Sequence, residues 1–180
     1  LPIFSYNRPL QLYSFLESSE KLVHGTDRTF ILYRSDSNYE AAYDKVKDRF
    51  SSATFTKQKN RSDFKPLLLE MLNNASDHVI FAVDDIIVRK EINLNLDKEL
   101  LEKHRAYGFY YRLGRNITHC YPLNMHTNPP RLRSISNNVF EFSIREGKGD
   151  WNYPNSVDMV LIRKKDIISL FSIIDRKSTR

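Results

Sequence analysis

The sequence predicts an α/β fold with a mixed, mostly parallel central sheet flanked by helices. Short strand-like segments alternate with amphipathic segments of roughly 10 to 15 residues through the first half of the chain, which is the pattern of βαβ units. The chain has 180 residues, of which 41% are hydrophobic and 28% are charged. This is enough to bury one sizeable core, so we expect a single domain over 1–180.

The first half contains four strand candidates, at 2–6, 29–33, 53–56 and 78–83. Asn7 is expected to cap the helix after the first strand, and Ser37 with Glu40 forms a capping-box pattern for the helix after the second. Ser62 is expected to cap a third helix. The buried side of that helix is predicted to carry Leu68, Met71 and Leu72.

The second half is less regular. The predicted elements are a helix over 97–105, strands over 107–113, 139–144 and 157–163, and a last helix from Asp166 to Ile174. Residues 119–138 contain three prolines and show no periodicity. We expect this segment to be irregular, as functional or mobile loops usually are.

Two adjacent carboxylates, Asp84 and Asp85, interrupt the apolar run from Val79 to Val88. Carboxylates in a buried strand need a cation or hydrogen bonds to offset their desolvation. Oxygen ligands at the end of such a strand suit Mg²⁺ or Mn²⁺. The alternative is a strand that ends at a turn with both carboxylates exposed. Ligands of an open α/β sheet bind outside the carboxyl ends of its strands, where this pair is expected.

Composition and charge narrow the class of protein. No apolar run approaches the roughly 18 residues of a membrane span, so we expect no transmembrane segment. The single cysteine, Cys120, fits a reducing compartment, which makes a cytoplasmic location the expectation and leaves peripheral membrane association open. A formal net charge of +6 favours anionic partners without choosing among them.

The segment Ile3-Phe4-Ser5-Tyr6-Asn7-Arg8-Pro9, the three further βα steps and the acidic pair resemble the nucleotide-sugar glycosyltransferases of the Rossmann-like GT-A fold. The similarity covers roughly residues 1–165. Val83-Asp84-Asp85 is similar to the x-D-D variant of the DxD motif found in GT2-like members. The resemblance implies a metal-dependent enzyme of carbohydrate biosynthesis. Such an enzyme moves a hexosyl or related group from a nucleoside-diphosphate donor to a glycan, lipid or protein acceptor.

The resemblance also implies roles for residues. Residues 1–90 would form the nucleotide-sugar-binding half and 91–180 the acceptor-side half, and whether the latter is truncated is left open. Asp85, with Asp84, would hold Mn²⁺ or Mg²⁺, and Asp84 would also make ribose or water-mediated contacts. The other donor-binding candidates are Ser5, Tyr6, Asn7, Arg8, Asp36 and Lys65.

Two carboxylates are candidates for the catalytic base. Asp150 lies in the flexible segment Gly147-Lys148-Gly149-Asp150-Trp151, and Asp158 lies in an alternating segment that would aim it at the cleft. We rank Asp150 first. The alternative for each is that it is an ordinary turn or strand-edge aspartate with no catalytic role. Trp151 and Tyr153 are candidates for a platform that binds the acceptor. The alternative is that both are loop aromatic residues that pack on the core.

Other groups of residues suggest different functions, but their patterns are weaker. His119, Cys120 and His126 have the composition of a zinc site, but adjacent ligands rarely fit one tetrahedral site. The aromatic and basic residues of 107–112 resemble a nucleic-acid platform, although a half-buried strand explains them better, and no nucleic-acid partner is expected. The remaining alternatives are a nucleotidyltransferase and a non-catalytic basic module that binds glycans or nucleic acid.

Overall fold

The computed structural model describes residues 1–173 and confirms the predicted fold class. Its centre is a six-stranded sheet in the order β4-β3-β1-β5-β12-β7. The first four of these strands are parallel, and β12 runs antiparallel to β5. The strands are β1 (Pro2–Tyr6), β3 (Phe30–Arg34), β4 (Thr54–Lys57), β5 (His78–Val83), β7 (Gly108–Tyr110) and β12 (Val160–Arg163).

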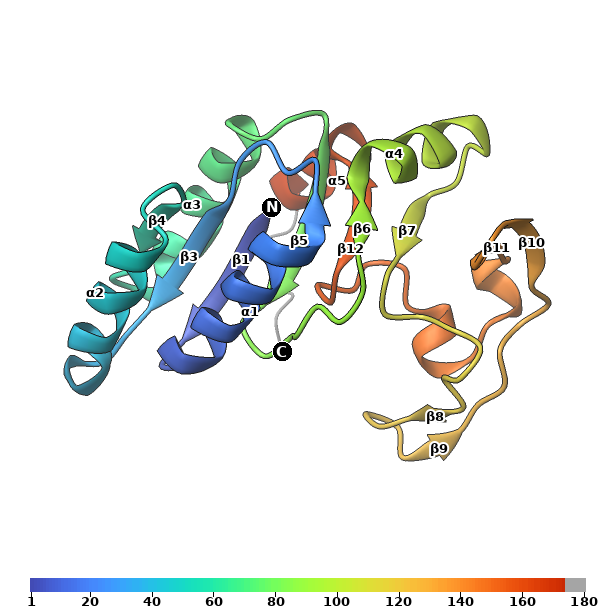
Figure 1. Ribbon diagram of the computed structural model, residues 1–180, viewed down its shortest axis with the longest axis horizontal. Helices are drawn as coiled ribbons and strands as arrows, with labels where there is room; N and C mark the ends of the chain where they lie inside the picture. The colour runs from blue at the N-terminus through green and yellow to red at the C-terminus, as the bar shows by residue number, and fades with distance from the viewer. Residues whose placement is uncertain (174–180) are drawn as a thin grey trace. The chain divides into compact units, whose positions relative to one another are not determined.

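Helices cover both faces of this sheet (Figure 1). Helices α1 (Pro9–Leu22) and α2 (Glu40–Arg49) pack side by side on one face, and α3 (Phe64–Asn73) and α5 (Lys164–Ile173) pack on the other. A further helix, α4 (Leu94–Lys103), follows a short parallel pair formed by β2 (Val23–His24) and β6 (Ile92–Asn93). The order of the strands explains the arrangement: the chain steps outward from β1 to β4 and then returns to β5, so α3 crosses on the opposite face.

Strand residues alternate between the two faces. Phe4 on β1 contacts the ring of Phe64 on α3 at a centroid distance of 5.5 Å, whereas Ser5 points toward α2. Tyr33 on β3 faces α2 in the same way as Ser5. The period of two therefore delivers one polar side chain, Ser5, into the interface with α1 and α2.

The chain divides into two compact units. The first is 1–109 with the described residues from Val157 on, and the second is Tyr110–Ser156. The second unit contains two short ribbons, β8 (His119–Cys120) with β9 (Met125–His126) and β10 (Arg133–Ser136) with β11 (Val139–Glu141). Two 3-10 helices, Ile144–Glu146 and Gly149–Asn152, follow. The predicted halves, 1–90 and 91–180, were defined by donor and acceptor binding. The division into compact units does not test them, so they stay a prediction.

Several predicted boundaries were wrong, each for a local reason. Asn7 does not cap α1: its backbone is left-handed (φ 55°) and Arg8 occupies the cap position. Ser37 begins a 3-10 turn, and Glu40 instead accepts a hydrogen bond from Ser35. Helix α3 is preceded by a 3-10 turn, Arg61–Asp63, and the capping box there joins Asn60 and Asp63, so Ser62 is not its cap.

In the second half, the predicted helix 97–105 begins at Leu94, because Asn93 caps it by accepting from the backbone of Asn95 and Leu96. The strands predicted at 107–113, 139–144 and 157–163 shorten to 108–110, 139–141 and 160–163. The segment predicted to be irregular, 119–138, contains three short strands. Ile174, the predicted end of the last helix, lies outside the described residues.

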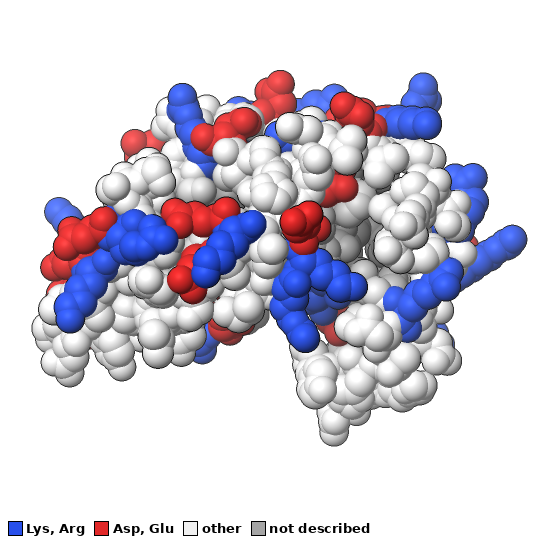
Figure 2. All heavy atoms as spheres, in the orientation of Figure 1, with Lys and Arg blue, Asp and Glu red and all other residues white. Residues whose placement is uncertain are grey.

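Charged side chains are interleaved on the helical face. Figure 2 shows Lys and Arg beside Asp and Glu over α1 and α2, and three ion pairs account for much of this: Lys21–Glu17, Lys47–Asp44 and Arg49–Glu20. The net positive charge is therefore not concentrated on α1 and α2. Among the described residues no helix is both long enough and apolar enough to cross a bilayer.

Candidate functional site

The acidic pair lies at the carboxyl end of β5, between β1 and β12 in the sheet. The Asp84 backbone N–H donates to the Phe4 carbonyl at 3.2 Å, which continues the β1–β5 pairing by one residue and carries Asp84 inward. The two carboxylates consequently differ. Asp84 is 4% exposed, whereas the Asp85 side chain is 54% exposed.

Arg8 bridges both carboxylates. Its Nη1 lies 2.8 Å from Asp85 Oδ2 and 3.6 Å from Asp84 Oδ1. It comes from the turn between β1 and α1, which ends at the same edge of the sheet as β5 because the two strands are parallel. One guanidinium therefore offsets the charge of two crowded carboxylates at this edge.

Burial dominates the electrostatics of Asp84. Desolvation raises the pKa of its carboxyl group, and the opposing influences are a hydrogen bond with Ser5, the charge of Arg8 and a hydrogen bond with the Tyr6 backbone. Asp84 Oδ2 is buried with no hydrogen-bond partner among residues 1–173. A buried acceptor in this condition is costly unless a ligand completes it.

The donor set fits a hard divalent cation only in part. Asp84 and Asp85 supply carboxylate oxygens, and Arg8 already holds a positive charge against them. Within 1–173 no group of three or more His, Cys, Asp or Glu side chains is arranged to hold a metal. Such a cation would depend on water and substrate oxygens for its other ligands, which is the usual condition of Mg²⁺ sites.

A second polar cluster joins the carboxyl ends of β1 and β3. Asn7 Nδ2 donates to Asp36 Oδ2 at 2.6 Å, and the Asp36 backbone N–H donates to Asn7 Oδ1 at 2.9 Å. The Tyr6 hydroxyl donates to the same Oδ2 at 3.4 Å, and the Arg34 guanidinium lies over the Tyr6 ring. Because Tyr6 and Asp36 are exposed, this cluster offers a ring face and a carboxylate to a ligand.

Two other donor candidates have different positions. Ser5 is buried and lies beneath the edge, where its hydroxyl contacts Tyr43. Lys65 is in the first turn of α3 and is half-buried. The amino end of α3 follows β4 after a short loop and the 3-10 turn Arg61–Asp63, which places Lys65 toward the carboxyl edge of the parallel strands.

Asp158 lies just before β12 and not within it, so the expected alternation over 157–161 was wrong. Its position is nevertheless informative, because β12 is antiparallel to β5 and its first residue, Val160, pairs with Phe81. The Met159 backbone N–H donates to the Phe81 carbonyl at 2.9 Å. Asp158 therefore lies at the edge where β5 ends, in the same compact unit as Asp85.

The remaining candidates belong to the second unit. Asp150 is ion-paired with Arg112 at 3.3 Å. Trp151 is 2% exposed, donates to the Ile117 carbonyl at 3.2 Å and packs edge-on against Phe142. A ring so buried presents no face to a sugar in this arrangement. Tyr153 is 60% exposed and keeps such a face.

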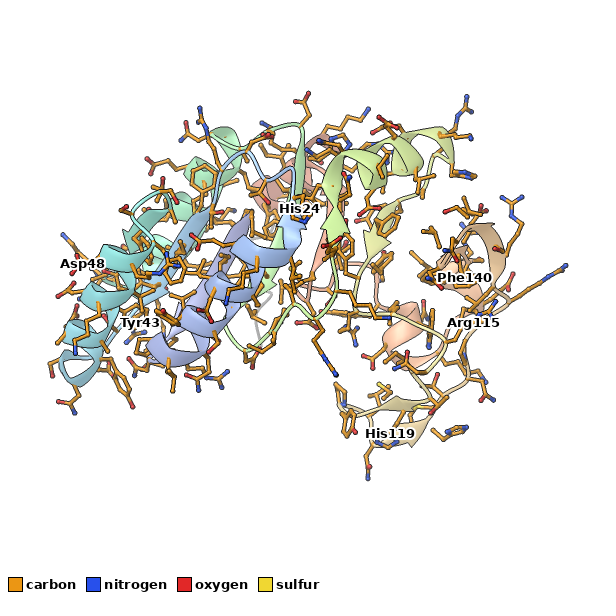
Figure 3. The ribbon with its side chains drawn as sticks, in the orientation of Figure 1. His24, Tyr43, Asp48, Arg115, His119 and Phe140 are labelled. Carbon is orange, nitrogen blue, oxygen red and sulfur yellow. The ribbon has the colours of Figure 1, made fainter. Side chains whose placement is uncertain are left out.

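Other polar features of this unit have structural explanations. Arg115 lies over the ring of Phe140 at 4.1 Å, and Figure 3 shows the two side chains next to one another. His119 pairs with His126 across the β8–β9 ribbon, whereas Cys120 is buried against Gly149. Cys120 thus points away from the two histidines.

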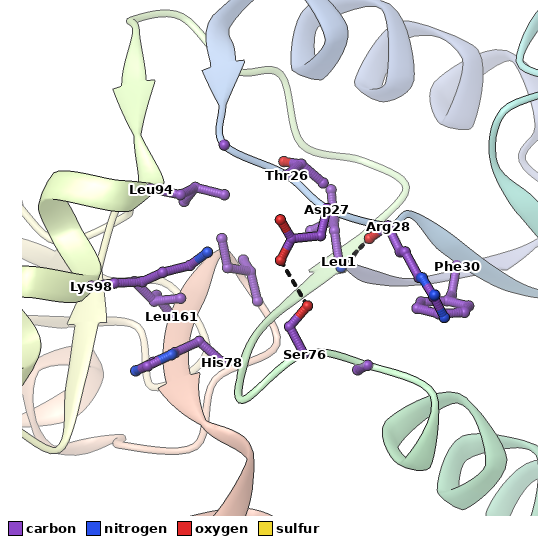
Figure 4. Close-up of a pocket in the computed structure, with 13 residues that line it drawn as sticks. Leu1, Thr26, Asp27, Arg28, Phe30, Ser76, His78, Leu94, Lys98 and Leu161 are labelled. Atoms are coloured by element: carbon purple, nitrogen blue, oxygen red, sulfur yellow. Dashed lines mark hydrogen bonds between the residues drawn. The ribbon is translucent and has the colours of Figure 1, made fainter.

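A pocket also lies at the opposite, amino end of the sheet (Figure 4). Its lining includes Phe30 at the start of β3 and His78 at the start of β5, and Ser76 donates to Asp27 at 2.7 Å beside it. Among residues 1–173, this edge carries no adjacent carboxylate pair comparable to Asp84 and Asp85. The carboxyl edge is thus the stronger candidate.

Tyr43 is a residue that the sequence did not identify. Its spacing on α2 indicated only a core position, and the side chain is indeed fully buried. Yet its hydroxyl lies 2.6 Å from Ser5 Oγ and accepts from the Arg8 backbone N–H at 3.3 Å. Nothing in the sequence pattern distinguishes this tyrosine from other core aromatic residues.

Comparisons with known proteins agree with this geometry. No protein-family model matches the chain. The chain is 30% identical, over an alignment of 191 residues, to the bifunctional glycosyltransferase pgtA of Dictyostelium discoideum; the alignment covers 94% of the chain and 24% of pgtA. The chain therefore spans about a quarter of the length of this curated relative.

Solved structures of S. aureus TarS share the fold. TarS aligns with a TM-score of 0.54 at 13% identity, covering 93% of this chain and 29% of TarS. TarS 1–349 aligns with a TM-score of 0.56 at 14% identity, and the alignment covers 94% of this chain and 48% of TarS 1–349. The complex of TarS 1–349 with UDP aligns with a TM-score of 0.54 at 12% identity, and that alignment covers 93% of this chain and 47% of the other. The structural similarity confirms the fold class, and the sequence similarity confirms the resemblance to glycosyltransferases.

Proposed function

We propose that this chain forms the donor-binding part of a metal-dependent glycosyltransferase that uses a nucleoside-diphosphate sugar. The observation that carries the proposal is the meeting of Asp84, Asp85 and Arg8 with the Asn7–Asp36 cluster at one sheet edge. The sequence similarity to a bifunctional glycosyltransferase supports it. Uridine diphosphate is the first nucleotide to test, because TarS 1–349 has been solved in complex with UDP.

Each group has a place in the proposal. The base and ribose would lie by Tyr6 and the Asn7–Asp36 cluster, and the diphosphate by Arg8 and Lys65. Asp85 and Asp84 would hold Mn²⁺ or Mg²⁺, which when bound supplies positive charge against the leaving diphosphate. The buried Asp84 Oδ2, which has no hydrogen-bond partner within residues 1–173, supports the proposed ligand role.

Asp158 replaces Asp150 as the preferred base. In an inverting transfer the acceptor oxygen attacks the anomeric carbon, the bond to the diphosphate oxygen breaks, and the acceptor proton passes to a carboxylate. Asp158 lies at the same edge as the acidic pair and in the same compact unit, whereas Asp150 belongs to the second unit. On the acceptor side, Tyr153 keeps an exposed ring and stays a candidate, and the acceptor can be a glycan, a lipid or a protein.

The test compares Asp85→Asn with the wild-type chain. Replacing a group that only supports a metal ligand typically lowers metal affinity by roughly 10- to 100-fold. We expect metal-dependent UDP affinity to fall by at least this much in Asp85→Asn, because Asp85 is proposed as a ligand itself. Folding should survive because Asp85 is exposed. Isothermal titration with UDP, with and without MnCl₂, measures the affinity. The control is Glu20→Gln. Glu20 forms an exposed ion pair with Arg49 at 3.3 Å, so this variant also neutralises a carboxylate that is paired with an arginine. Unaltered metal-dependent affinity in Asp85→Asn would remove Asp85 from the proposal, and no UDP binding by the wild type would end it.

A further inference from the structure

A chain of hydrogen bonds runs beneath the candidate site. Tyr43 on α2 has its hydroxyl 2.6 Å from Ser5 Oγ on β1, and both side chains are buried. The Arg8 backbone N–H donates to the Tyr43 oxygen at 3.3 Å. Helix α2 and the turn that follows β1 thus meet through three polar groups.

The direction of one of these hydrogen bonds follows from the protons available. The Arg8 backbone N–H can only donate, so the Tyr43 oxygen accepts from it. The Tyr43 hydroxyl proton stays available to Ser5 Oγ, and either hydroxyl can donate in that bond. The Tyr43 hydroxyl therefore serves both neighbours at once, and its two hydrogen bonds polarise one another.

The ring of Tyr43 is fixed independently of its hydroxyl. It stacks on Tyr33 with centroids 4.7 Å apart and an interplanar angle of 26°, and neither ring is appreciably exposed. Packing would hold a phenylalanine in the same place. The hydroxyl therefore serves a purpose other than filling the core.

We infer that Tyr43 is a positioning residue for the proposed donor site: its hydroxyl, held by Ser5, bonds the Arg8 backbone and so fixes the turn that presents the Arg8 guanidinium. The inference rests on the proposed function. The guanidinium that this turn presents lies 2.8 Å from Asp85 Oδ2 and 3.6 Å from Asp84 Oδ1. Neither Tyr43 nor Ser5 needs to touch the donor for this role.

The test is a double-mutant cycle of Tyr43→Phe and Ser5→Ala, read as UDP affinity in the presence of MnCl₂. Each single change is expected to weaken UDP binding about three- to tenfold, the equivalent of one net hydrogen bond. The double variant should lose little more than the larger single effect, because both changes break the same chain. Ser5→Thr keeps a hydroxyl and should restore most of the affinity lost in Ser5→Ala.

Tyr33→Phe is the matched control. It removes a hydroxyl from the other member of the stacked pair while keeping the ring, and the hydroxyl that lies 2.6 Å from Ser5 Oγ is that of Tyr43. We expect UDP affinity close to wild type. An equal loss in Tyr33→Phe, or additive losses in the Tyr43–Ser5 cycle, would show that general core packing is responsible and overturn the inference.

The outcomes also separate this inference from the proposed function. If wild type binds UDP with Mn²⁺ and Tyr43→Phe binds equally well, the positioning role fails and the proposed function stands. If wild type does not bind UDP at all, the proposed function fails. Should Tyr43→Phe not fold, the comparison of Ser5→Ala with Ser5→Thr decides alone, since it leaves the stacked rings intact. Equal affinity in those two variants would then overturn the inference.

Discussion

Asn7 and Asp36 hold each other by two hydrogen bonds, one from the Asn7 amide to the Asp36 carboxylate and one from the Asp36 backbone to the Asn7 carbonyl oxygen, at 2.6 and 2.9 Å. The pair ties the carboxyl ends of β1 and β3 together. It also explains the left-handed backbone of Asn7, because asparagine tolerates this conformation better than other residues with a side chain. One residue thus shapes the turn and fixes the orientation of an exposed carboxylate.

Replacing Asn7 separates these two contributions. Asn7→Gly keeps the backbone conformation but loses both hydrogen bonds, whereas Asn7→Ala also introduces strain at φ 55°, of about 1 kcal/mol or more. We expect both variants to weaken UDP binding to a similar extent and only Asn7→Ala to lower the melting temperature clearly. Titration calorimetry and thermal unfolding measure the two effects. Wild-type affinity in Asn7→Gly would show that the orientation of Asp36 does not matter for nucleotide binding.

Asp84→Asn should stabilise the protein at neutral pH. Desolvation raises the pKa of the folded-state carboxyl group, so the folded state takes up protons more readily and the carboxylate costs stability as pH rises. Asp84→Asn removes a buried charge, and we expect it to raise the free energy of unfolding by on the order of 1 kcal/mol.

The advantage of Asp84→Asn should be greatest above the raised pKa and should shrink below the pKa of the unfolded chain. Urea unfolding at several pH values measures it. A variant less stable than wild type at pH 7 would show that the contacts with Ser5 and Arg8 outweigh the desolvation.

Glu102→Gln should have the opposite effect and destabilise the protein at neutral pH. Hydrogen bonds from Arg163, at 2.8 Å, and from His78, at 2.9 Å, lower the pKa of the Glu102 carboxyl group. A lowered pKa means that the carboxylate adds stability at neutral pH and that this stability is lost as pH falls through the folded-state pKa. We expect Glu102→Gln to melt below wild type at pH 7 and to match it in acid.

The control for Glu102→Gln is Glu17→Gln, since Glu17 forms an exposed i,i+4 pair with Lys21 at 3.3 Å and such pairs contribute little. Thermal melts of the three proteins at pH 7 and in acid make the comparison. A pH-independent difference between Glu102→Gln and wild type would argue for packing in place of charge.

Trp151→Ala should unfold the second unit preferentially. The indole is buried against Phe142 and bonded to the Ile117 carbonyl, and truncating a large buried aromatic costs about 3–5 kcal/mol. We expect loss of hydrogen-exchange protection across Tyr110–Ser156, with UDP affinity retained because the donor candidates lie in the other unit. Exposed Tyr153→Ala is the matched control and should leave protection unchanged. Loss of UDP binding in Trp151→Ala would show that the donor site depends on the second unit.

The sequence by itself determined the alternation of strands and helices in the first half and the place of Asp84 and Asp85 at the end of a buried strand. Both are local properties. The period of apolar residues sets the element type, and a charged pair that interrupts an apolar run marks where a strand ends. For the same reason the buried face of α3, with Leu68, Met71 and Leu72, was predicted correctly.

Only the tertiary structure decided which side chains meet. Ser5 and Tyr43 are separated by 38 residues, and Arg8 and Asp85 by 77, so their contacts depend on sheet order and register, which no local pattern encodes. The same holds for Asp158, which is brought to the donor edge because β12 runs antiparallel to β5. It also holds for Trp151, whose burial depends on partners at 117 and 142. A hydrogen bond needs its atoms within about 3 Å, and only the folded arrangement of distant segments satisfies that condition.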